Sequence, residues 1–330
     1  IGCLVQWYEI EIIEEYIESV FQSLSDIENK ENIIVDIMVN MAQSLEEIDR
    51  DQKQLGEIFQ RFLNIRRTFS DRCRNYRFNF YPASIEQAAI DKKIKPYTIA
   101  DYRRDFNDKY SEEVDVLMWG ESDALIPKQT FQALDLLHTN NLEHNVHKYL
   151  AFFGTNKMWD ESWKPLEHPD FTDKPHTDGD FDNWWSLCYT MNLEEMNKFN
   201  DKVEDLDVRM VNPYKFNGCG LVISSDVIKS GVNIPKSAFF IHEDTAFMHS
   251  LIKTFNGSIP QFIIKNVLLV HNRKHPNKRQ YVKGEVGDTP SQQRESTGWY
   301  KKAWDYSHHN VYSMYEQKKI YNWEDVFNDK

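Results

Sequence analysis

Two carboxylates follow directly on a short apolar run and could bind a cation together. The run from Val114 to Met118 is interrupted only by Asp115 and leads through Trp119-Gly120 to Glu121 and Asp123. It predicts a buried strand, and open α/β sheets bind ligands just beyond the carboxyl ends of their strands. Two acidic groups at this spacing repel each other unless a cation or a shared proton relieves the repulsion. An acidic surface turn is the alternative interpretation.

A second acidic pair, Glu243 and Asp244, lies in the segment IHEDTAF at the start of a helix predicted over Asp244–Phe255. A carboxylate in this position could act as a general base. Acidic residues are also favoured in the first turn by the helix dipole, so capping of the helix is the structural alternative.

A histidine follows another predicted strand. Phe262–Val270 is mostly apolar and is followed by His271, and His275 comes four residues later. Histidine is a common metal ligand, although a single histidine at a strand end is more often structural. With Glu121 and Asp123, these histidines could also form the site of a metal-dependent hydrolase.

Basic and aromatic residues alternate between Arg66 and Tyr81, in an otherwise acidic chain. Five arginines within twelve residues suggest an anionic ligand such as phosphate, because guanidinium groups bind oxyanions through paired hydrogen bonds: Arg66, Arg67, Arg72, Arg74 and Arg77. A second basic stretch runs from Arg273 to Lys283. The two could line a groove for a polyanion, or they could serve a donor diphosphate and the surface only.

Strand and helix patterns alternate along the first part of the chain. The apolar run Ile1–Val5 precedes a helical pattern from Ile10 to Leu24, and the strand pattern Ile33–Val39 precedes a helix marked by Leu55–Leu63. This alternation predicts right-handed βαβ units and a mostly parallel sheet. Later elements are a helix opened by a Thr98/Asp101 capping box, a helix over Lys128–His138 with Pro127 in its first turn, and a strand at Gly220–Ser224.

Composition describes an ordinary globular protein of 330 residues, with 41% hydrophobic and 28% charged residues. A net charge of −13 disfavours nonspecific binding of nucleic acid. There is no apolar run of about 18 residues and no basic leader segment, and the four cysteines are scattered. We therefore expect a soluble, cytoplasmic protein. The irregular stretch 155–185, rich in Asp, Pro, His and Trp, predicts a functional loop or lid.

The order of these motifs resembles that of the GT-A fold glycosyltransferases, in particular family 2-like enzymes. The motifs are an N-terminal βα unit, YRRDFN, WGESD, NGCGLVIS, HEDTAF and a late histidine, over about residues 1–275. The resemblance implies an α/β GT-A (Rossmann-like) fold with a central, mostly parallel sheet flanked by helices, an acceptor-side region and a C-terminal extension. It implies a catalytic domain over 1–282, divided into a nucleotide-sugar-binding half (1–126) and an acceptor half (127–282, with the loop 155–185), followed by the extension 283–330.

The resemblance also implies roles for individual residues. Mn²⁺ or Mg²⁺ would be held by Asp123, Glu121 and His271, with Glu121 replacing the first Asp of the family's motif. Asp244 would be the catalytic base in an inverting reaction, beside Glu243. A nucleotide-sugar donor, expected to be a UDP-sugar, would meet Trp7, Tyr8, Glu9, Arg103, Arg104, Asn107 and Ser122. The acceptor would meet Trp184, Trp185, Arg273 and Lys274.

The acceptor is left open between a glycan or other soluble hydroxyl compound and hydroxymethylated phage DNA, as in phage-type DNA-modifying members. Other classes compete with the transferase. A nucleotidyltransferase would carry a Gly-rich phosphate loop after the first strand, where this chain has Gln6-Trp7-Tyr8-Glu9. A metal-dependent hydrolase and a non-catalytic binding protein with the same fold are the remaining alternatives.

Overall fold

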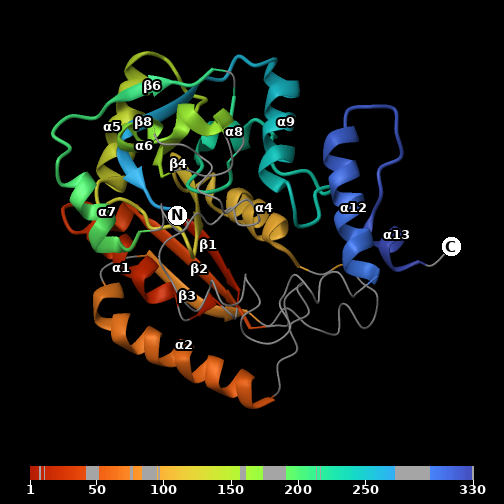
Figure 1. The fold of residues 1–330 in the computed structure, drawn as a ribbon, viewed down its shortest axis with the longest axis horizontal. Coiled ribbons are helices and arrows are strands. Elements are labelled where there is room, and N and C mark those ends of the chain that lie inside the picture. Colours follow the sequence, from red (N-terminus) through yellow and green to blue (C-terminus); the bar gives the residue numbers. More distant parts are fainter. Residues whose placement is uncertain are drawn as a thin grey trace.

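The structure is a computed structural model that describes residues 1–6, 9–10, 12–41, 52–74, 77–83, 95, 97–156, 161–173, 191–212, 214–215, 217–271 and 298–328. These residues form an α/β fold in which helices flank one central sheet (Figure 1). Among the described helices, none is both long enough and apolar enough to cross a bilayer.

In the described chain the sheet has eight strands in the order β3-β2-β1-β4-β7-β5-β8-β6. Strands β3, β2, β1 and β4 are parallel, whereas β7 runs antiparallel between β4 and β5, and β6 runs antiparallel to β8. The sheet is therefore parallel in its first half and mixed in its second. The strands are β1 (Gly2–Gln6), β2 (Ile34–Asn40), β3 (Arg77–Ala83), β4 (Val116–Glu121), β5 (Leu150–Thr155), β6 (Val208–Met210), β7 (Val222–Ser224) and β8 (Gln261–Leu269).

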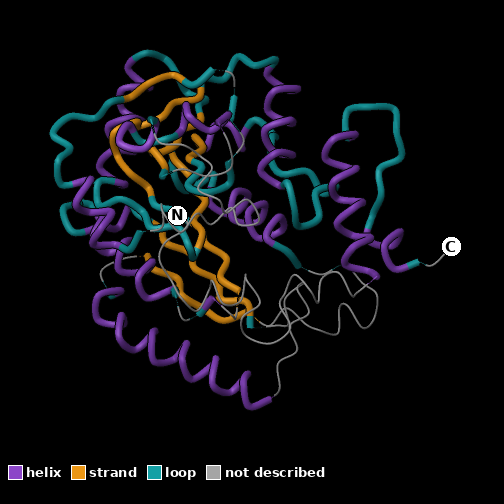
Figure 2. The backbone as a smooth tube through the Cα atoms, viewed as in Figure 1, coloured by secondary structure: helices purple, strands orange, loops and turns teal. Residues whose placement is uncertain are grey.

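Helices cover both faces of the sheet because side chains of a strand alternate between its faces. Side chains of α1, α2 and α5 share one hydrophobic cluster with Cys3 and Val5, and those of α4, α8 and α9 share another with Leu117 and Trp119. Figure 2 shows the helices arranged around the strands. The helices are α1 (Ile13–Leu24), α2 (Gln52–Cys73), α4 (Ile99–Tyr110), α5 (Thr130–Glu143), α6 (Pro169–Thr172), α7 (Leu193–Asn200), α8 (Ser225–Lys229), α9 (Glu243–Phe255), α12 (Gly298–Ser313) and α13 (Trp323–Phe327), with short 3₁₀ turns η2 (Lys30–Asn32) and η3 (Glu161–Leu166).

Most predicted elements are present within a few residues of their expected bounds. The capping box of α4 forms between Thr98 and Asp101. The basic-aromatic stretch 66–81 forms the end of α2 and part of strand β3. The sequence analysis treated it as one anion-binding stretch and did not predict this division. The strands β5 and β6 were not predicted, because an apolar run as short as Leu150–Phe153 has no diagnostic period.

A glycine lets a helix pack closely over the end of β4. A Cβ atom at Gly120 would collide with the buried hydroxyl group of Tyr16 on α1. Because Gly120 immediately precedes Glu121, this close approach fixes the backbone from which the first carboxylate projects.

The C-terminal helices pack on the loop that leads into α9. The ring of Trp323 stacks on Phe239 with centroids 4.6 Å apart, and the backbone N–H of Phe239 donates to Ser307 Oγ over 3.0 Å. Asn310 donates to the carbonyl of Ser237 over 3.0 Å. In Figure 1, α12 lies beside α9, on its side away from the sheet, and α13 lies next to α12.

If the C-terminal helices are an integral part of the fold, Trp323→Ala should reduce the free energy of unfolding by about 3 kcal/mol, the usual cost of deleting a buried aromatic ring. Urea denaturation measures this change. Leu136→Ala is the control, because that side chain is 52% exposed and should cost little. Equal stability of the two variants would mean that the C-terminal helices are only loosely attached.

Candidate functional site

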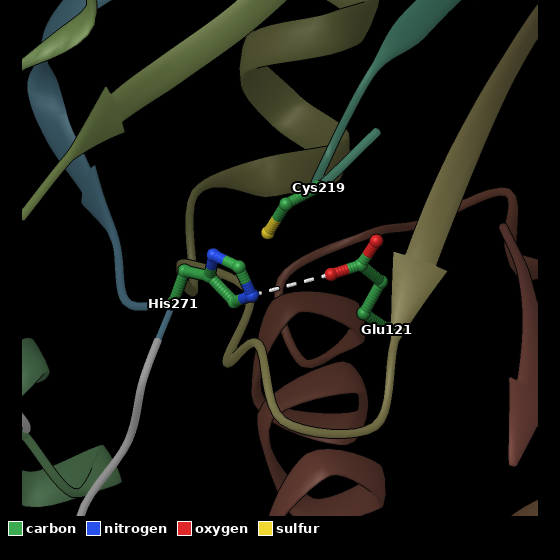
Figure 3. A group of neighbouring side chains, drawn as sticks. All are labelled: Glu121, Cys219 and His271. Atoms are coloured by element: carbon green, nitrogen blue, oxygen red, sulfur yellow. Dashed lines mark ion pairs between the residues drawn. The ribbon is translucent and has the colours of Figure 1, made fainter. Parts of the chain in front are cut away.

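Three predicted metal ligands meet at one edge of the sheet. The Nε2 atom of His271 lies 3.3 Å from Glu121 Oε2 and 3.6 Å from Asp123 Oδ2. Figure 3 shows the imidazole of His271 turned toward Glu121. Glu121 ends β4, Asp123 follows it and His271 follows β8, so the three come from the carboxyl ends of two strands.

A short backbone pairing brings the two strand ends together, although β7 and β5 separate β4 from β8 in the sheet. The N–H of Leu125 donates to the carbonyl of Val270 over 2.8 Å, and the reverse bond measures 3.3 Å. This antiparallel bridge places His271 opposite the turn that carries Asp123.

Cys219 also belongs to this group, although it was not among the predicted metal ligands. Its thiol lies with a carboxylate oxygen of Glu121 and a ring nitrogen of His271 such that all three ligand atoms are within 4.8 Å of one another. Figure 3 shows the sulfur directed between the other two side chains. Cys219 is buried just before β7, within NGCGLVIS. The sequence analysis includes this motif, but a single cysteine without a second cysteine nearby does not indicate a metal ligand.

Glu121, Cys219 and His271 form a donor set suited to a divalent cation, and Asp123 lies beside His271. Carboxylate oxygens suit Mg²⁺ and Mn²⁺, whereas an imidazole and a thiol favour softer ions such as Zn²⁺. Asp123, Cys219 and His271 are buried, while the side chain of Glu121 is 26% exposed, so the group opens on the Glu121 side. A cation here would relieve the repulsion between the two carboxylates.

Arg103 of α4 connects this group to the second acidic pair. Its guanidinium donates to Glu121 Oε1 over 2.6 Å, to Glu243 Oε1 over 2.5 Å and to the carbonyl of Gly218 over 3.2 Å. The residue is 2% exposed, and its guanidinium lies 4.9 Å from the ring centroid of Trp119. The end of β4 and the start of α9 are therefore held together through one buried cation.

The carboxyl group of Glu243 is electrostatically unusual. Burial raises its pKa to about 7, because desolvation disfavours the ionised form more strongly than Arg103 favours it, and the charge of Asp244 raises the pKa further. The neighbouring carboxylate of Asp244 accepts a hydrogen bond from the backbone N–H of Thr245 over 2.6 Å. The two acidic residues thus have different surroundings, although they are adjacent in sequence.

Arg104 and Asn107, predicted to bind the donor, direct their polar atoms into the protein. Arg104 donates to Asp101 over 2.7 Å and to the carbonyl of Ile234 over 2.8 Å. Asn107 accepts from the indole of Trp119 and donates to Asn233, each over 2.9 Å. Both side chains thus make internal hydrogen bonds in this structure, and their binding of the donor stays a prediction.

Glu9 and Ser122 lie together at the ends of β1 and β4. The hydroxyl of Ser122 donates to Glu9 Oε2 over 2.7 Å, and the N–H of Gln6 donates to the same oxygen over 3.2 Å. Both residues therefore lie near Glu121, and their binding of the donor stays a prediction. The other two residues of that prediction, Trp7 and Tyr8, lie outside the described residues.

The predicted acceptor-side residues Trp184, Trp185, Arg273 and Lys274 also lie outside the described residues, as does most of the predicted loop 155–185. Its described part, 161–173, forms η3 and α6. His275 and the basic stretch 273–283 are outside as well.

Several arginines of the stretch 66–81 are paired with carboxylates. Arg72 donates to Glu18 over 2.5 Å and lies 4.2 Å from the ring centroid of Phe21. Arg77 donates to Glu113 over 2.6 Å, and Arg74 pairs with Asp71 at 2.9 Å. Internal pairing thus accounts for three of the five arginines.

Comparisons with known proteins give a distant structural likeness. No protein-family model matches the chain, and no curated protein matches it either. Residues 1–349 of TarS from S. aureus are similar with 9% sequence identity and a TM-score of 0.44, over 97% of this chain and 75% of that one. The structure of the same protein in complex with UDP gives 11% identity, the same coverage and a TM-score of 0.44. A likeness this distant does not assign a function, which has to follow from the site itself.

Replacing Arg103 should destabilise the protein strongly, because two carboxylates would then face each other without their shared cation. Arg103→Ala should reduce the free energy of unfolding by about 3–5 kcal/mol, measured by urea denaturation near neutral pH. Arg103→Lys should recover only part of this, since an ammonium cannot donate to both partners in the same geometry.

Arg77→Ala is the matched control. It removes the ion pair with Glu113, whose side chains are 49% and 43% exposed, and such surface pairs contribute about 0–1 kcal/mol. Similar losses for the Arg103 and Arg77 variants would contradict the central position of Arg103.

Proposed function

We propose that the chain is a metal-dependent GT-A glycosyltransferase that transfers a sugar from a nucleotide-sugar donor, a UDP-sugar, to a hydroxyl acceptor with inversion. The observation that carries the proposal is the convergence of Glu121, Asp123 and His271 at the strand ends, linked through Arg103 to Glu243. The first group would hold the cation that stabilises the departing diphosphate, and the separate carboxylate pair would supply the base for the acceptor hydroxyl.

The donor side of the site would be formed by the strand ends. Asp123 and His271 would hold the cation, with Cys219 as a further donor and Glu121 contacting the cation or the ribose. A bound divalent cation supplies the positive charge that stabilises the departing diphosphate. Glu9, joined to Ser122, would meet the nucleoside part of the donor.

The acceptor side would use the first turn of α9. Asp244 would take the proton of the acceptor hydroxyl while its oxygen bonds to the anomeric carbon and the bond from that carbon to the diphosphate breaks. Glu243 is tied to Arg103, and would keep α9 at a fixed distance from the cation site. A base on the side opposite the leaving group yields inversion at the anomeric carbon.

Glu243 is the alternative base. A general base works best with a pKa near the working pH, and the raised pKa of Glu243, about 7, meets that condition. Its ion pair with Arg103 argues for a positioning role, because an oxygen held by a guanidinium is a poorer proton acceptor. The assignment of Asp244 therefore depends on comparing the two residues directly.

A metal-dependent hydrolase is the second candidate, favoured by the thiol of Cys219 and the imidazole of His271 beside two carboxylates. The products separate the candidates when a UDP-sugar is the substrate. Attack at the anomeric carbon releases UDP, whereas hydrolysis within the diphosphate releases UMP and a sugar phosphate.

Removal of metal should abolish turnover. We expect UDP release from a UDP-sugar to stop in excess EDTA and to return with added Mn²⁺, because the leaving group then regains its counter-charge. Asp123→Ala should reduce the rate about 100-fold or more, with unfolding stability unchanged or slightly higher, since one of two repelling carboxylates is gone. Asp201→Ala, at a side chain that is 57% exposed, is the control. Full activity in EDTA would exclude a required metal.

Asp244→Asn should retain binding of the UDP-sugar and lose transfer by about 10²–10⁴-fold, the usual contribution of a general base. Glu243→Gln should have a smaller effect. The profile of kcat/KM against pH provides a second measurement: a base is active when deprotonated, so a rate that falls as the pH drops below about 7 points to Glu243. That profile, together with a larger loss in Glu243→Gln, would transfer the role of base to Glu243.

A further inference from the structure

Aromatic rings form an exposed stripe along the C-terminal helix α12 and the turn after it. Trp304, His308 and Tyr312 recur every four residues, which places them on one face of α12, and Tyr315 follows in the turn after the helix. Trp304, Tyr312 and Tyr315 are 40%, 50% and 47% exposed. Large exposed rings gathered on one face often mark a binding surface. We call these four residues the ring stripe.

The Trp304 end of the ring stripe adjoins the residue that precedes the acidic pair, because the rings of Trp304 and His242 lie 6.2 Å apart, centroid to centroid. His308 Nδ1 lies 3.2 Å from Nε2 of His242, and the ring of Tyr312 lies 5.7 Å from that of His242, centroid to centroid. His242 directly precedes the acidic pair of α9, and its φ of 56° is rare for a residue with a side chain. The α12 rings thus pack around a strained backbone position next to Glu243 and Asp244.

The other end of the ring stripe reaches a hollow of about 390 Å³ between α9 and the turn after α12, lined by His249, Ile252, Lys253, Asn256 and Tyr315. The rings of His249 and Tyr312 lie 5.9 Å apart, so the hollow continues the stripe. Figure 1 shows α9 and α12 next to each other. A chain-like ligand could therefore extend from the acidic pair along α12.

The charge of the C-terminal helices favours a neutral ligand. Residues 298–328 contain four lysines and four acidic residues. Lys301 pairs with Asp305 at 3.3 Å, Lys318 with Glu316 at 2.6 Å and Lys319 with Asp325 at 2.8 Å. Nucleic acids are bound largely through an excess of cations that neutralise phosphates, and the sequence 298–328 has no such excess.

We propose that the ring stripe and the adjoining hollow bind a neutral carbohydrate chain, the acceptor of the transfer; this rests on the proposed function. The C–H-rich faces of sugar rings stack on aromatic faces, which bury apolar area without a charged partner. The stripe holds the chain along α12, and its terminal sugar presents a hydroxyl group to Asp244.

Binding of short neutral oligosaccharides of glucose, galactose and N-acetylglucosamine to the full chain, measured by isothermal titration, tests the proposal. We expect one of these series to bind, and Trp304→Ala and Tyr312→Ala each to weaken that binding about tenfold, the scale of one lost aromatic contact. Trp304→Phe should restore most of the affinity. Phe59→Ala is the matched control, because Phe59 is 41% exposed on α2, away from α12.

Three results would overturn the proposal. The first is no binding of any of these oligosaccharides, and the second is equal binding by the Trp304, Tyr312 and Phe59 variants. The third is binding of a hydroxymethylcytosine-containing DNA duplex that the Trp304 and Tyr312 variants lose. Melting temperatures near that of the unaltered protein show that α12 remains folded in the variants. Release of UDP from a UDP-sugar is measured separately in the unaltered chain, so a failure of the proposed transferase activity is distinguishable from a failure of carbohydrate binding.

Discussion

The site depends on one buried cation, the guanidinium group of Arg103. Glu121 ends β4 and Glu243 begins α9, so the two residues lie far apart in sequence. Both of their carboxylates form ion pairs with this guanidinium. Without a shared positive charge, their repulsion and the cost of desolvating them would separate the strand end from the helix. A buried ion pair adds little net stability but strongly penalises any arrangement that breaks it. It therefore fixes geometry more than it stabilises the fold.

The surroundings of Arg103 support that geometry at each end. Arg104 and Asn107 on the same helix bind the loop 233–235 and the indole of Trp119, so α4 is held to both β4 and the loop that leads toward α9. The backbone bridge between Leu125 and Val270 then brings His271 to the carboxylates. Positioning residues behind the site account for much of the polar content of α4.

Much of the frame was predictable from local patterns. The strand before Glu121, the capping box of α4 and the amphipathic pattern of α9 depend on neighbouring residues, and the structure contains all three. The grouping of Glu121, Asp123 and His271 was also expected, through the resemblance to GT-A enzymes. Strand β3 was not, because the arginines of the stretch Arg66–Tyr81 dominated its interpretation. The pairing of Arg72 with Glu18 and of Arg77 with Glu113 depends on other elements.

The sequence by itself determined which residues carry acidic, basic and imidazole groups and where the strongly patterned strands and helices lie, because both follow from residue type and short-range spacing. Only the tertiary structure decided that Cys219 faces His271, that Arg103 joins two carboxylates, and that the rings of α12 lie against His242. Each of these contacts joins segments that are distant in the chain. Their formation depends on how the sheet and helices pack, and a contact of that kind leaves no periodic signal in a single sequence.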